Sequence, residues 1–271
     1  MRAFYDYYLK DENNGWEFTP KVRMCIFNPG GKDIINRPEG EFPLPRQQTK
    51  HLYLDASSKT MSAEQSQKTT NSVTFDSTAK EHVDFTHTFD QRTELTGYFA
   101  VKLWIEALEA TDVDLFVFWD KVDVSGRNIE HLNVDPGFLQ DDPEAERAKV
   151  HAPDLKMHHI FWSGGGYGRL RASHRKLSPA STPHNPQYTH QREDLQPLGG
   201  AGDVVAVEIE MRPYGIIFER GERIRLQVAG YDSMGDLPWL PTTSTINKGK
   251  VAIHMGGEYD SHFVLPLVAE G

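Results

Sequence analysis

The sequence has 271 residues, and its 39 Asp and Glu against 29 Lys and Arg give a net charge of −10. This acidic balance argues against a nucleic-acid partner, which usually meets a basic face, and fits a soluble protein with an acidic surface. The single cysteine, Cys25, excludes an internal disulfide framework and a Cys-rich zinc site, and we expect it to be a small buried hydrophobe in a strand.

The N-terminus, MRAFYDYYLK, predicts a short helix. It pairs Phe4 with Tyr8 and Tyr5 with Leu9, and residues four apart share one helix face. The same stretch lacks the apolar region of a secretory signal. No apolar run in the sequence approaches the 18 residues that suggest a transmembrane helix. We therefore expect a cytoplasmic protein without a membrane partner.

Alternation of apolar and polar residues with a period of two dominates the rest of the chain. In DVVAVEIEMRP, for example, Val205, Val207 and Ile209 share one face. Runs of this kind, rich in β-branched and aromatic residues and bounded by turn residues, predict strands. They occur at residues 21–27, 51–55, 82–89, 98–108, 112–122, 203–213, 222–230, 250–256 and 262–268.

The fold class follows from this pattern. Alternation on one side only is typical of antiparallel sheets with one buried face, and few helical patterns intervene between the runs. We predict an all-β fold, a two-sheet jelly-roll sandwich of the galactose-binding-domain-like type. Polar composition predicts long loops at 57–72, 123–160 and 176–202, with a short helix at 142–150 in the second of them.

No catalytic constellation is apparent. Ser233 lies in GYDSMG, which is out of register with a Gly-x-Ser-x-Gly elbow and has no following helix. There is no His-Glu-x-x-His and no phosphate-binding loop, so we predict neither a catalytic residue nor a cofactor. Asp112 and Asp114 share a strand face and are weak candidates for a calcium site. A polar strand edge is the favoured interpretation of these two acids.

The stretch YGRLRASHR, residues 167–175, is the main candidate for binding. As a strand it would point Leu170 and Ala172 one way and its arginines the other. We favour hydrogen bonds and ion pairs that hold the following proline-rich segment. The alternative is contact with a ligand, because a guanidinium is a natural carboxylate clamp. The residues concerned are Arg171, Ser173, His174 and Arg175.

Aromatic residues at or near loops allow a carbohydrate-binding interpretation, because sugar rings stack on such side chains. Burial in the core is the more common fate of aromatic residues in sandwiches. The candidates are Trp162, Tyr167, Tyr231 and Trp239.

Several strings then resemble, in order along nearly the whole chain, the C-terminal domain of the X-prolyl dipeptidyl-peptidase and cocaine-esterase (CocE/NonD) family of serine hydrolases. The N-terminal FYDYYLKDENNGWEFTPKVRMCIF is similar to the start of that domain. Further similar segments are EFPLP followed by LYLD, GYFAVKLWIEALEATDVDLFVFWDKVDVSGR, GRLRASHR and GGEYDSHFVLPLV.

The resemblance implies an enzyme with an α/β-hydrolase domain, a helical cap and a C-terminal jelly roll, of which this chain covers the jelly roll. It therefore implies residues 1–18 as the junction segment, residues 19–271 as the jelly-roll domain, and a catalytic domain as partner, with a homo-oligomer as a further expectation. The Ser-His-Asp triad would lie outside this chain. Two alternatives stay open, since sandwiches host many functions: a stand-alone carbohydrate- or ligand-binding module and a complete enzyme with an unconventional site.

Overall fold

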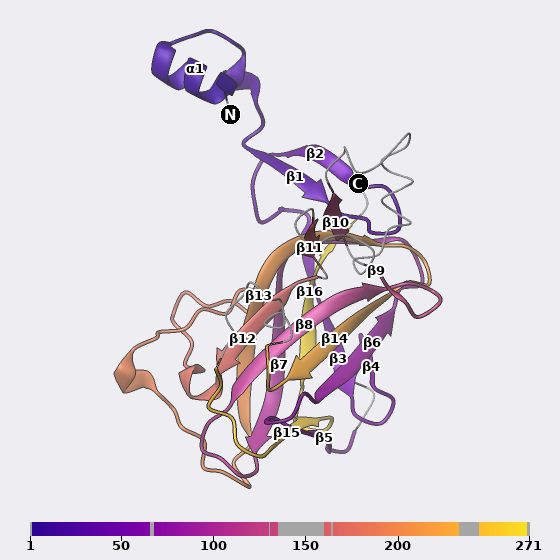
Figure 1. The fold of residues 1–271 in the computed structure, drawn as a ribbon, viewed down its shortest axis with the longest axis vertical. Coiled ribbons are helices and arrows are strands. Elements are labelled where there is room, and N and C mark those ends of the chain that lie inside the picture. Colours follow the sequence, from indigo (N-terminus) through magenta and orange to yellow (C-terminus); the bar gives the residue numbers. More distant parts are fainter. Residues whose placement is uncertain are drawn as a thin grey trace.

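The computed structural model describes residues 2–65, 68–129, 131–134, 160–163, 165–232 and 244–269, with only the backbone described at 131–134 and 160–163. Strands make up most of it (Figure 1). The strands are β1 (Val22–Ile26), β2 (Ile34–Glu39), β3 (Gln47–Asp55), β4 (Thr60–Ser62), β5 (Asn71–Asp76), β6 (His82–Thr88), β7 (Thr93–Ala107), β8 (Asp114–Val122), β9 (Asn128–Ile129), β10 (His131–Val134), β11 (Ile160–Ser163), β12 (Tyr167–Arg171), β13 (Val205–Phe218), β14 (Arg223–Ala229), β15 (Lys250–Met255) and β16 (His262–Val268).

The main sheet is continuous in hydrogen bonding and folds into the two layers of a sandwich. Its order is β12-β8-β14-β6-β4-β3-β16-β7-β15-β5, with β13 paired to β7 and β9 to β8. The short β4 connects the layers, because it pairs antiparallel with β3 and parallel with β6. Strands β1 and β2 form a separate hairpin, and β10 and β11 pair antiparallel in a second two-stranded sheet. The predicted all-β sandwich is confirmed.

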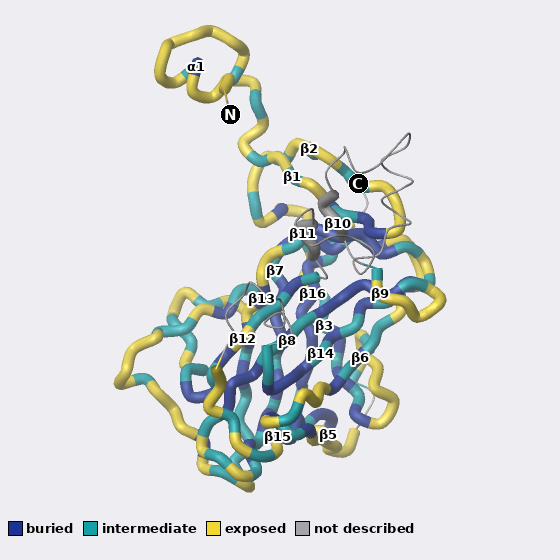
Figure 2. Tube along the Cα trace, in the orientation of Figure 1, coloured by how far each residue is buried: buried dark blue, intermediate teal, exposed yellow. Residues whose placement is uncertain are grey.

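The core lies between the two layers, where Figure 2 shows the buried residues concentrated. Phe99 of β7 stacks on Trp119 of β8 with ring centroids 4.9 Å apart, so the largest side chains of opposite layers meet. Both are fully buried, as are Phe85 and Phe263. Trp119 and Phe99 occupy inward positions that the alternation of their strands predicts. The sequence pattern therefore selects the core face correctly.

Two predictions are wrong, one about a polar stretch and one about Cys25. The expected loop at 57–72 contains β4 and the start of β5, and Met61 of β4 is only 3% exposed. A strand of three residues is too short to give a periodic signal, but it fills the gap between β3 and β6. Cys25 is exposed, because successive side chains of β1 alternate and its neighbour Ile26 takes the buried position. The helix predicted at 142–150 lies outside the described residues.

The expected N-terminal helix is present as α1 (Arg2–Lys10), followed by the 3-10 turn η1 (Trp16–Phe18). Further 3-10 turns are η5 (Ala172–His174) and η6 (Arg192–Asp194). In Figure 1, α1 extends away from the sandwich beyond the β1–β2 hairpin. None of the helices in the described ranges is long and apolar enough to cross a membrane.

Candidate functional site

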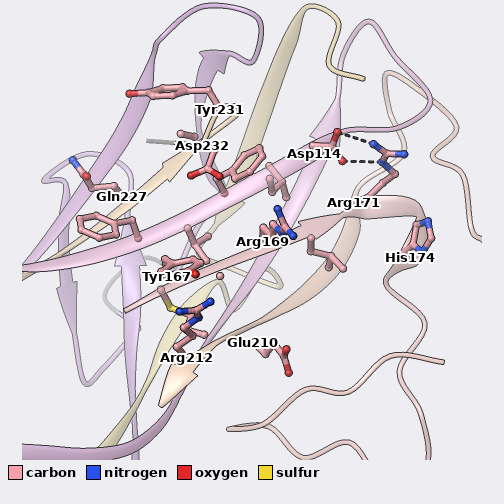
Figure 3. Close-up of a pocket in the computed structure, with 18 of the residues that line it drawn as sticks. Asp114, Tyr167, Arg169, Arg171, His174, Glu210, Arg212, Gln227, Tyr231 and Asp232 are labelled. Atoms are coloured by element: carbon pink, nitrogen blue, oxygen red, sulfur yellow. Dashed lines mark hydrogen bonds and ion pairs between the residues drawn. The ribbon is translucent and has the colours of Figure 1, made fainter. Parts of the chain in front are cut away.

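Strand β12 places its side chains as the alternation predicts. Leu170 and Ala172 are buried, at 5% and 0% exposed, whereas Arg169 and Arg171 lie on the outer face (Figure 3). The strand ends at Arg171, and η5 then buries Ser173 to 5% exposure. A continuing strand would place Ser173 on the outer face. The 3-10 turn does not keep the two-residue alternation of a strand, so Ser173 is buried instead.

Arg171 forms a two-pronged ion pair with Asp114 on the neighbouring strand β8 (Figure 3). Its Nε lies 2.8 Å from Oδ1 and its Nη2 lies 3.0 Å from Oδ2, and these hydrogen bonds raise the pKa of Arg171. Asp114 Oδ2 also accepts the backbone N–H of Ile246 at 3.0 Å. The Asn247 side chain donates to the carbonyls of Asp114 and Gly230, at 3.0 and 2.7 Å. This group therefore joins β12, β8 and the segment that leads into β15.

The proline-rich segment that follows β12 is fastened by the same stretch of chain. The backbone N–H of Ser173 donates to Asp112 Oδ1 at 2.9 Å, and its carbonyl accepts the N–H of Gln196 at 2.8 Å. The Arg175 guanidinium donates to the carbonyls of Ala172 and Gln196. These contacts are of the kind expected for a structural role, and contact of Ser173 or Arg175 with a ligand stays a prediction.

The calcium candidates are engaged in the same contacts. Asp112 accepts the N–H groups of Val113 and Ser173, and Asp114 binds Arg171. Within the described ranges, no group of three or more His, Cys, Asp and Glu side chains is placed to hold a metal ion. Because calcium takes six to eight oxygen ligands, the structure adds no support for this site.

A cavity of about 950 Å³ lies on the outer face of β12 and β8, flanked by residues of β13, β14 and the segment after β12 (Figure 3). It brings together four of the sequence candidates, which are Tyr167, Arg171, His174 and Tyr231. Trp162 lies on β11, where only the backbone is described, and Trp239 lies outside the described residues.

Arg212 of β13 is a cavity residue that the sequence analysis missed. Its guanidinium carbon lies 4.4 Å from the centroid of the Tyr167 ring, a cation–π contact. Strands β12 and β13 approach closely at Gly168, where a Cβ would lie 2.0 Å from the carbonyl oxygen of Glu210. The alternation of β13 places Arg212 on an outer face, but its neighbour Tyr167 becomes known only from the topology.

One Ser–His–acid group lies together in the described residues, on the other layer. His254 Nε2 lies 2.8 Å from Glu106 Oε2, as in a catalytic dyad. The hydroxyl of Ser261, however, donates to the backbone carbonyl of His254 at 2.6 Å and accepts the N–H of Trp104. Ser261 is 1% exposed. A nucleophile must be reachable and must contact the imidazole of its base, so this group is structural.

The N-terminal arm, which we define as residues 2–18, presents apolar side chains to solvent. Leu9 and Phe18 are 76% and 83% exposed, and Tyr5 and Tyr8 are about half exposed, at 49% and 59%. The rings of Phe4 and Tyr8 contact each other, with centroids 4.8 Å apart. Figure 2 shows the arm almost wholly exposed. The arm therefore exposes apolar surface to solvent.

The chain that follows the arm is held to the sandwich by a buried lysine. Lys121 of β8 is 1% exposed, and its Nζ lies 2.7 Å from Glu222 Oε2. The ammonium also donates to Asn28 Oδ1 and to the carbonyls of Pro29 and Ile217, at 3.0, 2.9 and 2.9 Å. Burial lowers the pKa of Lys121, and the hydrogen bond that its ammonium donates to Glu222 opposes this effect. The turn between β1 and β2 is thereby fixed to the sandwich.

Comparison with known families agrees with this organisation. Residues 14–264 match the family described as the X-Pro dipeptidyl-peptidase C-terminal non-catalytic domain. The chain belongs to this family. The resemblance noted in the sequence is thus confirmed, and so is its fold, a non-catalytic β-sandwich found at the C-terminus of CocE/NonD and X-Pro peptidase-like hydrolases. No curated protein matches the chain.

Solved structures show the same relationship. A CocE/NonD family hydrolase from Staphylococcus aureus matches 99% of this chain with a TM-score of 0.81 and 31% identity, and a second crystal structure of it gives 0.80. An aminopeptidase from a marine sediment Thaumarchaeota archaeon matches 99% with a TM-score of 0.58 and 14% identity, which shows the shared fold. This chain spans 45% of the length of the S. aureus hydrolase.

Proposed function

We propose that this domain packs on an α/β-hydrolase catalytic domain, shapes one wall of its substrate cleft, and leaves the hydrolysis of peptide, ester or amide bonds to that domain. The observation that carries the proposal is the exposed apolar arm at residues 2–18. Family membership supports it, because the family is defined as the non-catalytic C-terminal part of such hydrolases.

The physical argument is the cost of the arm's surface. Fully burying one large apolar side chain is worth about 1.5–3 kcal/mol, so leaving several of them in water is unfavourable. Contiguous exposed apolar surface of this kind marks an interaction site. Within the helix, Asp6 accepts hydrogen bonds from Lys10 and Arg2 at 2.5 and 3.3 Å, so α1 is braced without contact to the sandwich core. The arm is thus a formed surface that suits a second domain.

Removal of the apolar side chains tests the proposal. In the absence of the catalytic domain, the arm should associate with further copies of this chain. We expect the double variant Tyr5→Ser/Leu9→Ser to weaken self-association roughly tenfold or more in sedimentation velocity, since two exposed apolar side chains are lost. Its strand circular dichroism should not change.

Val124→Ser is the matched control, because Val124 is 72% exposed but lies in the turn after β8. It should leave association as it is. If the double variant unfolds instead, Tyr5 and Leu9 belong to the core of this domain, and the docking proposal loses its support. Unchanged association of the double variant would contradict it as well.

The stand-alone carbohydrate module remains a hypothesis of a different class. The cavity next to Tyr167 is of a size that suits a small ligand. One face of the Tyr167 ring, however, carries the Arg212 guanidinium, so that face is not free to stack on a neutral sugar. The chemistry at this cavity favours a charged ligand over a neutral sugar.

A further inference from the structure

The cavity on β12 contains two guanidinium groups that have no acid partner among the described residues. Arg169 of β12 and Arg212 of β13 both line it and both are exposed, whereas Arg171 beside them is paired with Asp114. In a protein with a net charge of −10, acids are in excess over bases. Two unpaired cations that line one cavity therefore suggest an anion that is not part of the described chain.

The geometry prepares both cations for the same ligand. Arg212 is held on the Tyr167 ring, which restricts its side chain before any ligand binds. Arg169 follows Tyr167 by two residues on a strand, so both side chains point to the same face about 7 Å apart along it. Figure 3 shows Arg169 and Arg212 on the side of β12 that faces the cavity. One anionic group between them can receive hydrogen bonds from both.

The remaining lining residues define the class of ligand. Glu210 and Asp232 also line the cavity and offset the positive charge of the two arginines. The cavity is therefore poorly suited to a dianion such as phosphate. Phe116 and Phe118 occupy outer positions of β8 and supply apolar surface. A guanidinium binds a carboxylate through two parallel hydrogen bonds. We propose that this cavity binds a small organic carboxylate, with Arg169 and Arg212 as donors to its oxygens and the phenylalanines beside its apolar part.

Isothermal titration calorimetry with this chain tests the proposal. The probe is 3-phenylpropionate, and its neutral analogue 3-phenylpropionamide has the same apolar part. We expect millimolar or tighter binding of the acid, about tenfold weaker binding of the amide, and weaker binding of inorganic sulfate, which lacks an apolar part. Raising NaCl from about 50 to about 200 mM should weaken binding of the acid but not of the amide, because salt screens charge.

Variants locate the site. Arg169→Gln and Arg212→Gln should each weaken binding of the acid about tenfold, and Arg212→Lys should have an intermediate effect because it keeps the charge but loses the planar fork. Arg220→Gln is the matched control, an exposed arginine in the β13–β14 turn. Circular dichroism reports whether each variant folds. If a variant does not fold, the salt dependence of binding to the unaltered chain tests the proposal.

Three results would overturn the proposal. They are no binding of the acid up to about 10 mM, equal affinity for acid and amide, and an equal loss in Arg220→Gln. The test uses this chain alone, so its outcome is independent of docking to a catalytic domain.

Discussion

Replacing the buried Lys121 by methionine should strongly destabilise the domain. Methionine keeps the apolar stem in place but removes the ammonium that contacts Glu222, Asn28 and two backbone carbonyls. The Glu222 side chain, only 11% exposed, then stays in the fold without its cation. The loss therefore combines an uncompensated charge with three acceptors that lack their donor.

The magnitude follows from these contacts. Breaking a buried ion pair by removing one partner costs about 3–5 kcal/mol. With a urea dependence of about 3 kcal/mol per molar, the unfolding midpoint should fall by about 1–1.7 M. The double variant Lys121→Met/Glu222→Gln removes the orphaned charge as well, so we expect it to recover part of the loss, but not the part due to the carbonyls of Pro29 and Ile217.

The assay is equilibrium unfolding in urea, followed by fluorescence and circular dichroism. Lys102→Met is the matched control, because Lys102 pairs with Asp260 at 2.8 Å but both side chains are partly exposed, at 24% and 40%. Exposed pairs contribute about 0–1 kcal/mol, so this variant should change little. A loss below about 1 kcal/mol in Lys121→Met, or one equal to that of Lys102→Met, would refute the reasoning.

Further measurements test other parts of the structure. Gly168→Ala should cost about 1–3 kcal/mol of stability in thermal unfolding, because its Cβ would lie 2.0 Å from the Glu210 carbonyl; an unchanged melting temperature contradicts the close approach. Hydrogen bonds from Ser125 and the Arg127 N–H lower the pKa of Asp123 to about 2, so its stabilising contribution is present above pH 3.8 and is lost as pH falls through about 2. Carboxyl NMR that gives a pKa near 3.8 would exclude this. The chain alone should not hydrolyse p-nitrophenyl acetate or X-Pro nitroanilides, and turnover that a serine-directed phosphonate abolishes would show otherwise.

Local pattern predicts well where neighbouring residues alone decide the outcome. The strands of the core, the inward positions of Leu170 and Ala172 and the helix α1 all follow from spacing along the chain. Short strands such as β4 cannot be predicted from alternation, because Met61 supplies a single apolar position and no period. The inward position of Lys121 was predictable, since it continues the row of Val117 and Trp119. Its role was not predictable, because that role depends on the residues that its ammonium contacts.

The amino-acid sequence by itself determined the all-β class, the core faces and the family, because alternation and motif order are properties of consecutive residues. Only the tertiary structure decided which distant residues meet. Arg171 meets Asp114 across 57 positions, and Lys121 meets Glu222 across an interval no local pattern spans. The cavity that joins Tyr167 to Arg212 depends on strand order and register in the same way. Register is set by the sum of many cross-strand contacts, so no single motif in the sequence contains it.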